Sequence, residues 1–407
     1  MSDNALSQAP ARAALPAARI GGYSIAELAL AVGSFGIGTG EFAIMGLLPQ
    51  VADSFAVSVP DAGVVISSYA IGVVVGAPLI AVMAARYSRR TVLLALMTLF
   101  ALGNLASAIA GSFGLLIAAR FLAGLPHGAY FGVAALVAAG MAPANQQARA
   151  IGRVMMGLTV ATLLGTPLAA WFGQALGWRA AFAIVGAISM LTVALVYTHV
   201  PKDKANPLAT PLKELAALGR IQVWLTLGIC AIGCGGMFVV FTYITPALTE
   251  SAGVPLASVP MMLSVFGAGM ILGNIVGSRL ADWALMPAIG IALVFNLVAF
   301  VLFYFTMSSP WLAVINVLLI GGGFTVVPGI QMRLIKVSGD AQTLAAALSH
   351  SAFNIANAIG AWLGGVSIAA GYGWTSTGVV GAIMGVAGIA IFLTSYMLDR
   401  AQAKSPA

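Results

Sequence analysis

Three ionisable residues lie inside stretches of sequence that are otherwise strongly apolar. Glu41 interrupts an apolar run that begins near Ile25 and continues to Leu48, and Arg120 and His127 both lie in the stretch RFLAGLPHGAYFG. A carboxylate without a partner in such surroundings is costly, so it either binds a proton or pairs with a cation. A guanidinium keeps its charge, so a buried arginine needs acceptors. Together these residue types predict chemistry based on the binding and release of a proton.

Each of the three residues also has a purely structural explanation. Glu41 can be a protonated side chain bonded to a helix backbone, Arg120 a strut that binds carbonyl groups of neighbouring helices, and His127 a hydrogen-bonded packing residue. We favour a proton carrier for Glu41, because it is the only acid well inside an apolar stretch. Arg120 then supplies a fixed positive charge that favours ionised Glu41 in one conformation and releases it in another. His127 follows Arg120 by about two helical turns, so it lies on nearly the same helix face and can change its charge near neutral pH.

The composition places these residues in a membrane protein. Of 407 residues, 61% are hydrophobic and 7% are charged, whereas a soluble globular chain carries about 25% charged residues. A membrane-spanning helix needs about 20 apolar residues, so the length allows about twelve spans. Cys230 and Cys234 have no histidine or acid nearby, which favours neither a disulfide framework nor a metal site. We therefore expect no cofactor and a proton gradient as the source of energy.

The apolar residues fall into twelve stretches with a polar connection in the middle. The stretches are 24–46, 62–83, 91–110, 113–140, 151–174, 179–199, 223–247, 258–280, 285–307, 310–333, 343–368 and 375–397. The longest connection, residues 200–222, reads as a cytoplasmic linker with a short amphipathic helix between a first bundle at 24–199 and a second at 223–397. Residues 1–23 and 398–407 read as cytoplasmic tails. The predicted fold is an all-α polytopic membrane protein with twelve transmembrane helices in two pseudo-symmetric six-helix bundles.

Lysine and arginine residues set the predicted orientation, because basic loops stay in the cytoplasm. With both termini inside, the outer loops hold only Arg179 and one span holds Arg120, whereas the other sixteen basic residues face the cytoplasm. The net charge of +7 therefore reflects topology and not binding to nucleic acid. Arg12 and Arg19 precede a hydrophobic stretch longer than the core of a signal peptide, so we expect the first residues to be a cytoplasmic tail and not a cleaved signal.

The two halves repeat with an offset of 197 residues. The matching pairs are Pro49 with Pro246, Asp53 with Glu250, Ser54 with Ser251, Val57 with Val254, Gly72 with Gly269 and Gly76 with Gly273. Because six is even, both halves enter the membrane from the same side, as do the parallel repeats of carriers that rock around a central site. Glycines four residues apart, such as Gly72 and Gly76, allow helices to approach closely.

Two stretches carry a resemblance to a known family. GAPLIAVMAARYSRRTVLL resembles the cytoplasmic-loop signature of the major facilitator superfamily through Gly76, Arg86, Arg89 and Arg90. Ala85 stands where the family has an acid, and Ser88 where it has a glycine, whereas the second-half copy GNIVGSRLADW keeps the acid as Asp282. The first-half loop therefore lacks the acid that a charge relay of this signature would use.

Two further motifs narrow the resemblance to one branch. RFLAGLPHGAYFG is similar to the arginine-and-glycine motif of the family through Arg120, Gly124 and Gly128. GLTVATLLGTPLAAWFG resembles the antiporter signature, which separates exporters from importers, through the residues Gly157, Gly165, Pro167 and Gly173. The chain is identified as a member of the twelve-helix drug:proton antiporter branch, and it resembles the arabinose-efflux, purine-nucleoside-efflux and chloramphenicol-efflux permeases.

The resemblance implies export of a small neutral or weakly polar molecule in exchange for protons, by alternating access, with Glu41, Arg120 and His127 as the proton-coupling residues. The spans that line the axis in this fold supply an aromatic lining with amides for orientation. The candidate substrate contacts are Phe42, Met45, Tyr130, Phe238, Phe241, Tyr243, Asn354 and Asn357.

Other function classes fit the sequence less well. A passive facilitator or sugar uniporter of the same fold is the alternative, although it would need neither the antiporter motif nor Glu41. An enzyme would need a nucleophile or a metal cluster, so we expect none. The expected partners are the small-molecule substrate, protons and membrane lipid, without nucleic acid. We expect a functional monomer in the bacterial inner membrane.

Overall fold

The computed structural model describes residues 19–20, 23–84, 86–143, 147–203, 219–338 and 342–404. Within these residues, twelve helical spans are long and apolar enough to cross a membrane, which confirms the predicted fold class. Helices are the expected solution, because a chain in hydrocarbon must satisfy its backbone hydrogen bonds internally. The amphipathic helix predicted inside the linker falls in 204–218 and lies outside the described residues.

The first bundle contains spans one to six. A pair of two-residue strands, β1 (Arg19–Ile20) and β2 (Tyr23–Ser24), precedes it. Its helices are α1 (Ile25–Phe42), α2 (Leu48–Phe55), α3 (Val59–Ala62), α4 (Val64–Ala84), α5 (Arg89–Ala108), α6 (Phe113–Gly124), α7 (His127–Met141), α8 (Gln147–Val160), α9 (Thr166–Leu176) and α10 (Trp178–His199). A 3₁₀ turn at Ala43–Gly46 follows α1, and a π-helical segment at Ala161–Gly165 joins α8 to α9.

The second bundle contains spans seven to twelve. Its helices are α11 (Ile221–Gly228), α12 (Gly235–Thr242), α13 (Ile244–Pro246), α14 (Val259–Trp283), α15 (Leu285–Thr306), α16 (Pro310–Gly322), α17 (Val326–Ser338), α18 (Gln342–Ser367) and α19 (Ser376–Lys404). The π-helical segments are Ile229–Gly233, Ala247–Ser251 and Ile368–Tyr372, and the 3₁₀ turns are Leu256–Ser258 and Gly323–Thr325.

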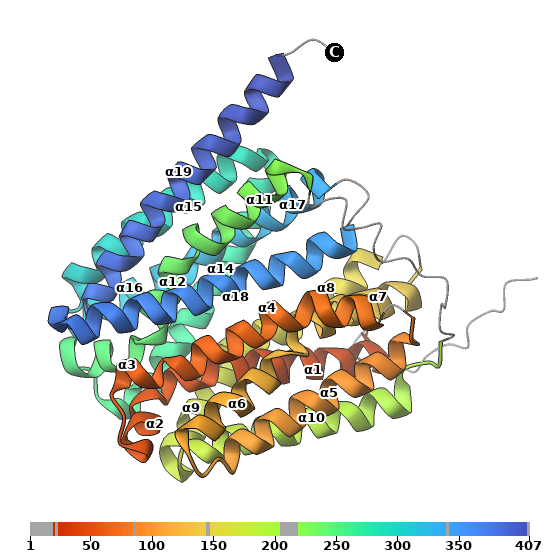
Figure 1. Cartoon of the computed structure of the whole chain (residues 1–407), viewed down its shortest axis with the longest axis horizontal. Coiled ribbons are helices and arrows are strands. Elements are labelled where there is room, and N and C mark those ends of the chain that lie inside the picture. Colours follow the sequence, from red (N-terminus) through yellow and green to blue (C-terminus); the bar gives the residue numbers. More distant parts are fainter. Residues whose placement is uncertain are drawn as a thin grey trace, which may run out of the picture.

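The two bundles lie side by side, with α1 to α10 below and α11 to α19 above in Figure 1. They meet where α4 packs along α18 and where α9 packs on α14. Twelve spans bring the start of α1 and the end of α19 to one side of the molecule, which we call the terminal face. The side that carries α2 and α3 is the opposite face.

The repeat seen in the sequence has a structural counterpart at the opposite face. Trp178 Nε1 donates a hydrogen bond of 2.8 Å to Ser54 Oγ in the first half. Trp374 Nε1 donates one of 2.7 Å to Glu250 Oε2 in the second half. Each tryptophan follows a glycine with positive φ that ends the preceding span, Gly177 at 91° and Gly373 at 77°. The same anchor therefore holds the corresponding corner of each bundle.

Glycines bring the second and fourth spans into backbone contact. A Cβ atom on Gly124 of α6 would overlap the carbonyl oxygen of Tyr69 on α4, and one on Gly76 would overlap that of Leu125. Close approach of this kind is typical of small residues at helix interfaces in membranes. It fixes α4, and with it Tyr69, directly beside the helix that carries Arg120.

Candidate proton and substrate site

Arg120 lies in a fully buried pocket of the first bundle, with 0% of its surface exposed. Its Nη2 donates a hydrogen bond of 2.9 Å to the carbonyl oxygen of Gly40, and its Nη1 donates one of 3.4 Å to Asn104 Oδ1. The guanidinium carbon lies 4.3 Å from the ring centre of Tyr69 and 5.0 Å from that of Phe182. The flat cation is thus held by two oxygen acceptors and two aromatic faces.

Glu41 follows immediately after the carbonyl group that Arg120 binds. It is 7% exposed, and its carboxylate forms no hydrogen bond or ion pair with the residues that the structure describes. It does interact electrostatically with Arg120 and with Tyr69. The acid and the base are therefore near each other without a direct bond, an arrangement that leaves the carboxylate free to gain or lose a proton.

Tyr69 connects the Arg120 pocket to His127. The Tyr69 hydroxyl and His127 Nδ1 share a hydrogen bond of 2.9 Å, and both side chains are buried. The ring centre of His127 lies 6.0 Å from that of His350, on α18 of the second bundle. His350 in turn stacks on Phe131, with ring centres 5.0 Å apart and planes within 3° of parallel. A continuous row of polar and aromatic groups thus runs from Arg120 to the bundle interface.

Sequence reasoning missed Tyr69 and His350. The three histidines, His127, His199 and His350, are dispersed in the sequence without ligand spacing, so nothing in the sequence singles out His350. No spacing rule places α18 against α4 and α7, because that contact depends on how the bundles pack. For Tyr69, the sequence did hold a signal. Gly72 and Gly76 of the second span and Gly124 of the fourth span allow the two helices to cross closely, and such a crossing brings nearby residues together.

Some of the candidate substrate residues join the two bundles at the opposite face. The rings of Phe42 and Phe241 are in edge contact at 5.9 Å, and Thr245 Oγ1 donates a hydrogen bond of 3.0 Å to the carbonyl oxygen of Met45. The aromatic and methionine candidates on the first and seventh spans are all buried: Phe42, Met45, Phe238, Phe241 and Tyr243. In this conformation Phe42 and Met45 contact Phe241 and Thr245 of the second bundle, which closes the bundle interface at that end. The Tyr243 hydroxyl donates a hydrogen bond of 2.8 Å to the carbonyl oxygen of Ala361 on α18.

The three other candidates differ in how well their polar atoms are satisfied. The Tyr130 hydroxyl donates a hydrogen bond of 2.8 Å to the carbonyl oxygen of Leu30, so it is occupied within the first bundle. Asn354 Nδ2 donates one of 3.0 Å to the carbonyl oxygen of His350, but its Oδ1 has no partner among the described residues. Asn357 is 1% exposed, and neither of its amide atoms has such a partner. Buried amides without partners are costly, so these two are the candidates best suited to bind a ligand.

The glycines of the antiporter motif hold the fifth span against the first. A Cβ atom on Gly157 would overlap the carbonyl oxygen of Ala31, and one on Gly173 would lie 2.5 Å from a methyl group of Leu47. Pro167 lies in the first turn of α9, directly after the π-helical segment. On the other side of that segment, a Cβ atom on Gly267 of α14 would meet the carbonyl oxygen of Thr162 at 2.5 Å. The fifth span therefore lies between the helix that carries Glu41 and the second bundle.

We expect Gly165→Leu to reduce transport at least tenfold while the protein still folds. A Cβ atom at Gly165 would overlap Thr39 Oγ1 and lie 3.0 Å from the ring of Phe35, so a larger side chain must push α9 away from α1. The matched control is Gly132→Leu, because no described atom lies within 4 Å of a Cβ atom at that helical glycine. Uptake into vesicles measures both variants, and size-exclusion chromatography checks folding. Full transport in Gly165→Leu would show that this contact does not matter.

The first-half loop receives its acid from the linker. Asp203 accepts hydrogen bonds of 2.8 Å and 3.1 Å from the backbone N–H groups of Arg89 and Arg90, at the N-terminus of α5. A carboxylate is favourable at this end of a helix dipole. The guanidinium of Arg90 binds the carbonyl oxygen of Tyr197, and that of Arg89 donates a bond of 3.4 Å to Leu136. In the sequence, Asp203 could have been noticed as an acid that follows the sixth span by four residues.

The other motif residues have different surroundings. Arg86 and Asp282 are exposed, and neither forms an ion pair with a residue that the structure describes. Ala85 lies outside the described residues. A Cβ atom on Gly128 would lie 2.7 Å from Ala77 and 3.6 Å from the Cβ atom of His350, so this glycine is part of the bundle interface.

Known proteins resemble this chain over most of its length. The chain is 40% identical over 376 residues to the inner membrane transport protein YdhP of Escherichia coli K12, which covers 92% of the chain and 96% of that protein. It is 32% identical to a chloramphenicol resistance protein of Streptomyces lividans, over 81% of the chain and 86% of that protein.

Solved structures show the same architecture. The crystal structure of a D-xylose-proton symporter superimposes with a TM-score of 0.74, at 17% identity, and covers 90% of this chain and 96% of that one. At this identity the likeness shows the fold alone. The sequence profile of the Major Facilitator Superfamily matches residues 30–339. The chain therefore belongs to the major facilitator superfamily and is an integral membrane transporter of that fold.

Proposed function

We propose that the chain is a proton-coupled antiporter that exports small neutral or weakly polar molecules across the bacterial inner membrane, with both termini in the cytoplasm. The observation that carries this proposal is the buried Glu41 carboxylate beside Arg120, without a direct bond between them. A permanent ion pair would hold its proton state fixed. A carboxylate near, but not bound to, a buried cation can be charged in one conformation and protonated in the other.

Arg120 is suited to stay in place while Glu41 changes its charge. Its hydrogen bonds go to the Gly40 carbonyl oxygen and to Asn104, so they do not depend on the state of the carboxylate. One proton that moves inward across 100 mV supplies about 2.3 kcal/mol. If one proton is exchanged for one neutral molecule, this energy supports roughly a 50-fold substrate gradient.

The bundle contacts offer a route from proton binding to movement. Glu41 lies on α1, and the glycines of the fifth span hold that helix against α8 and α9. The fifth span in turn contacts α14 of the second bundle. At the opposite face, Phe42 from the same α1 helix contacts Phe241 of the second bundle. A shift of α1 would therefore change the contacts at the closed end of the interface, as rocking of the two repeats requires.

A neutral substrate fits the polar groups of the interface. Asn354 and Asn357 offer unsatisfied amide atoms, and aromatic side chains lie nearby on α12. The relative named for chloramphenicol resistance supports export of a neutral compound of this kind. Ligands that bear a strong charge would instead need an opposite charge in addition to Glu41 and Arg120.

Inside-out membrane vesicles test the proposal directly. The chain should accumulate its substrate when respiration acidifies the vesicle interior and makes it positive, and accumulation should collapse when a protonophore removes both the pH gradient and the membrane potential. A sugar, a nucleoside and chloramphenicol form the first substrate panel. Substrate that only equilibrates, at a rate that the protonophore does not change, would instead identify a passive facilitator.

A further inference from the structure

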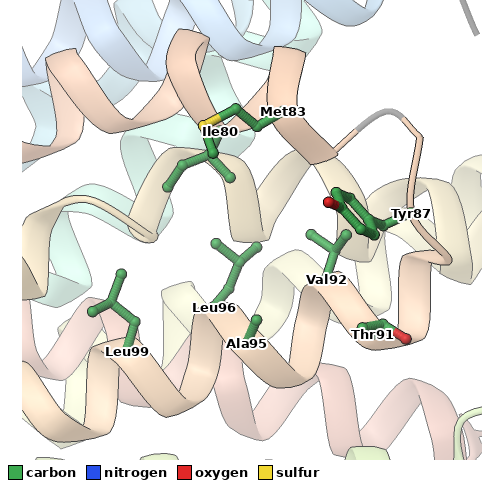
Figure 2. Close-up of a pocket in the computed structure, with 8 residues that line it drawn as sticks. All are labelled: Ile80, Met83, Tyr87, Thr91, Val92, Ala95, Leu96 and Leu99. Atoms are coloured by element: carbon green, nitrogen blue, oxygen red, sulfur yellow. The ribbon is translucent and has the colours of Figure 1, made fainter.

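An apolar groove opens on the outer surface of the first bundle, near the terminal face. Its volume is about 340 Å³, and it lies between the end of α4 and the start of α5. Figure 2 shows Ile80 and Met83 on α4 across from Val92, Leu96 and Leu99 on α5. Tyr87, in the loop between the two helices, lies at the end of the groove that is nearer the terminal face.

The two halves differ at a residue that lines the groove. In the second half, a third glycine, Gly277, brings the end of α14 into contact with the carbonyl oxygen of Thr325 on the tenth span. The 197-residue offset places Ile80 at the corresponding position of the first half. The first half therefore lacks this glycine contact, and the branched side chain of Ile80 lines the groove instead.

The groove faces outward and not toward the substrate path. An exposed apolar stripe runs along the outside of α4 through Ile71, Val75, Leu79 and Met83, and Met83 is also part of the groove wall. In a membrane-spanning protein this stripe meets lipid chains, so a lipid chain is the occupant that is always at hand.

The loop at the end of the groove carries an excess of positive charge. Arg86 is exposed, and its guanidinium has no partner within the described part of the chain. It directly precedes Tyr87 of the groove, and Arg89 and Arg90 follow as the first two residues of α5. The acid of this region, Asp203, is bound to backbone N–H groups of α5. Basic pockets of this type at the cytoplasmic ends of transmembrane helices bind anionic headgroups.

We infer that this groove is a binding site for an anionic phospholipid. One acyl chain lies between α4 and α5 along Ile80, Leu96 and Leu99, and the phosphate group lies beside Arg86. The site is separate from the proton site and does not depend on the proposed antiport. Because the loop joins two spans of the first bundle, the bound lipid holds the ends of α4 and α5 at a fixed separation.

Native mass spectrometry of the purified full chain tests the site. The protein is delipidated and then incubated with equal amounts of phosphatidylglycerol and phosphatidylethanolamine. We expect one retained lipid with a preference for phosphatidylglycerol. Arg86→Gln should reduce that preference by about fivefold, the factor that one basic residue supplies at a membrane surface. Glycerol phosphate, which has the anionic group without acyl chains, should not displace the lipid.

A second variant tests the contribution of the apolar groove separately from that of the Arg86 charge. Ala95→Trp fills the groove and should remove the retained lipid whatever its headgroup, because Ala95 is a lining residue. Leu102→Trp on the same helix is the control, since Leu102 is exposed outside the groove. Arg279→Gln, at an exposed arginine near the end of α14, is the control for charge. Equal retention of the two lipids by the wild type, or a lipid that survives Ala95→Trp as it survives Leu102→Trp, would overturn the inference.

Discussion

Glu41→Gln vesicles are expected to exchange substrate across the membrane but to lose its accumulation against a gradient. Glutamine keeps the size and polarity of the buried side chain, but it cannot release a proton. Because the Glu41 carboxylate forms no hydrogen bond with a described residue, the substitution removes no bond that the fold needs. The measurement compares counterflow of labelled substrate with its uphill uptake in the same vesicles. The roughly 50-fold gradient that one proton can support should fall to equality.

Glu27→Gln is the matched control for this experiment. Glu27 lies on the same helix, where it caps the N-terminus with Ser24 and forms an ion pair of 3.0 Å with Arg153. Glutamine can also complete such a capping box, so this variant should retain accumulation. If Glu41→Gln concentrates substrate as steeply as the wild type does, another group carries the proton. His127 and His350 would then be the groups to test next.

Arg120→Lys is expected to lower the rate of proton-driven transport by a factor of ten to a hundred. A lysine ammonium cannot reproduce the planar fork that reaches Gly40 and Asn104 while it stacks between Tyr69 and Phe182. A buried polar group left without its partner costs about 1–3 kcal/mol, which corresponds to a change of that size. Initial rates of uptake in vesicles measure the effect, and thermal unfolding in detergent checks that the variant is folded.

Arg179→Lys provides the comparison. Arg179 also donates to a backbone carbonyl, that of Ala110 at 3.0 Å, and also stacks on an aromatic ring, that of Trp178 at 4.3 Å. It is exposed, so water can replace whatever contact the lysine loses. Transport should therefore be retained. Equal rates in Arg120→Lys and wild type, with the same proton stoichiometry, would mean that transport does not need the guanidinium fork of Arg120.

The elements of the fold were predictable because the lipid environment leaves so few options. A run of apolar residues such as 285–307 can only be a spanning helix, and α15 occupies Leu285–Thr306. An irregular stretch near Gly165 and Pro167 was predictable, because proline loosens a helix backbone, and the π-helical segment Ala161–Gly165 lies there. The π-helical segment at Ile229–Gly233 was not predictable, since it interrupts an apolar run with no proline beside it and depends on the packing of neighbouring helices.

The candidate site was only partly predictable. Glu41 and Arg120 stand out in a sequence because an ionisable group in an apolar run is rare and costly. Tyr69, Asn104 and His350 are ordinary residues until helix packing brings them to that pair. The aromatic candidates Phe42 and Phe241 show a further limit, because their contact belongs to one arrangement of the two bundles and composition does not describe arrangements.

The Asp203 cap also changes where the first half of the molecule ends. By helix boundaries, that half stops at His199, the last residue of α10. By contacts, it extends to Asp203, which satisfies two backbone N–H groups of α5. The first residues of the connecting segment, up to Asp203, thus belong structurally to the first bundle. Anyone who divides this protein into two separately expressed modules should cut after Asp203, because a cut at His199 removes the residue that caps α5, the third span of the first bundle.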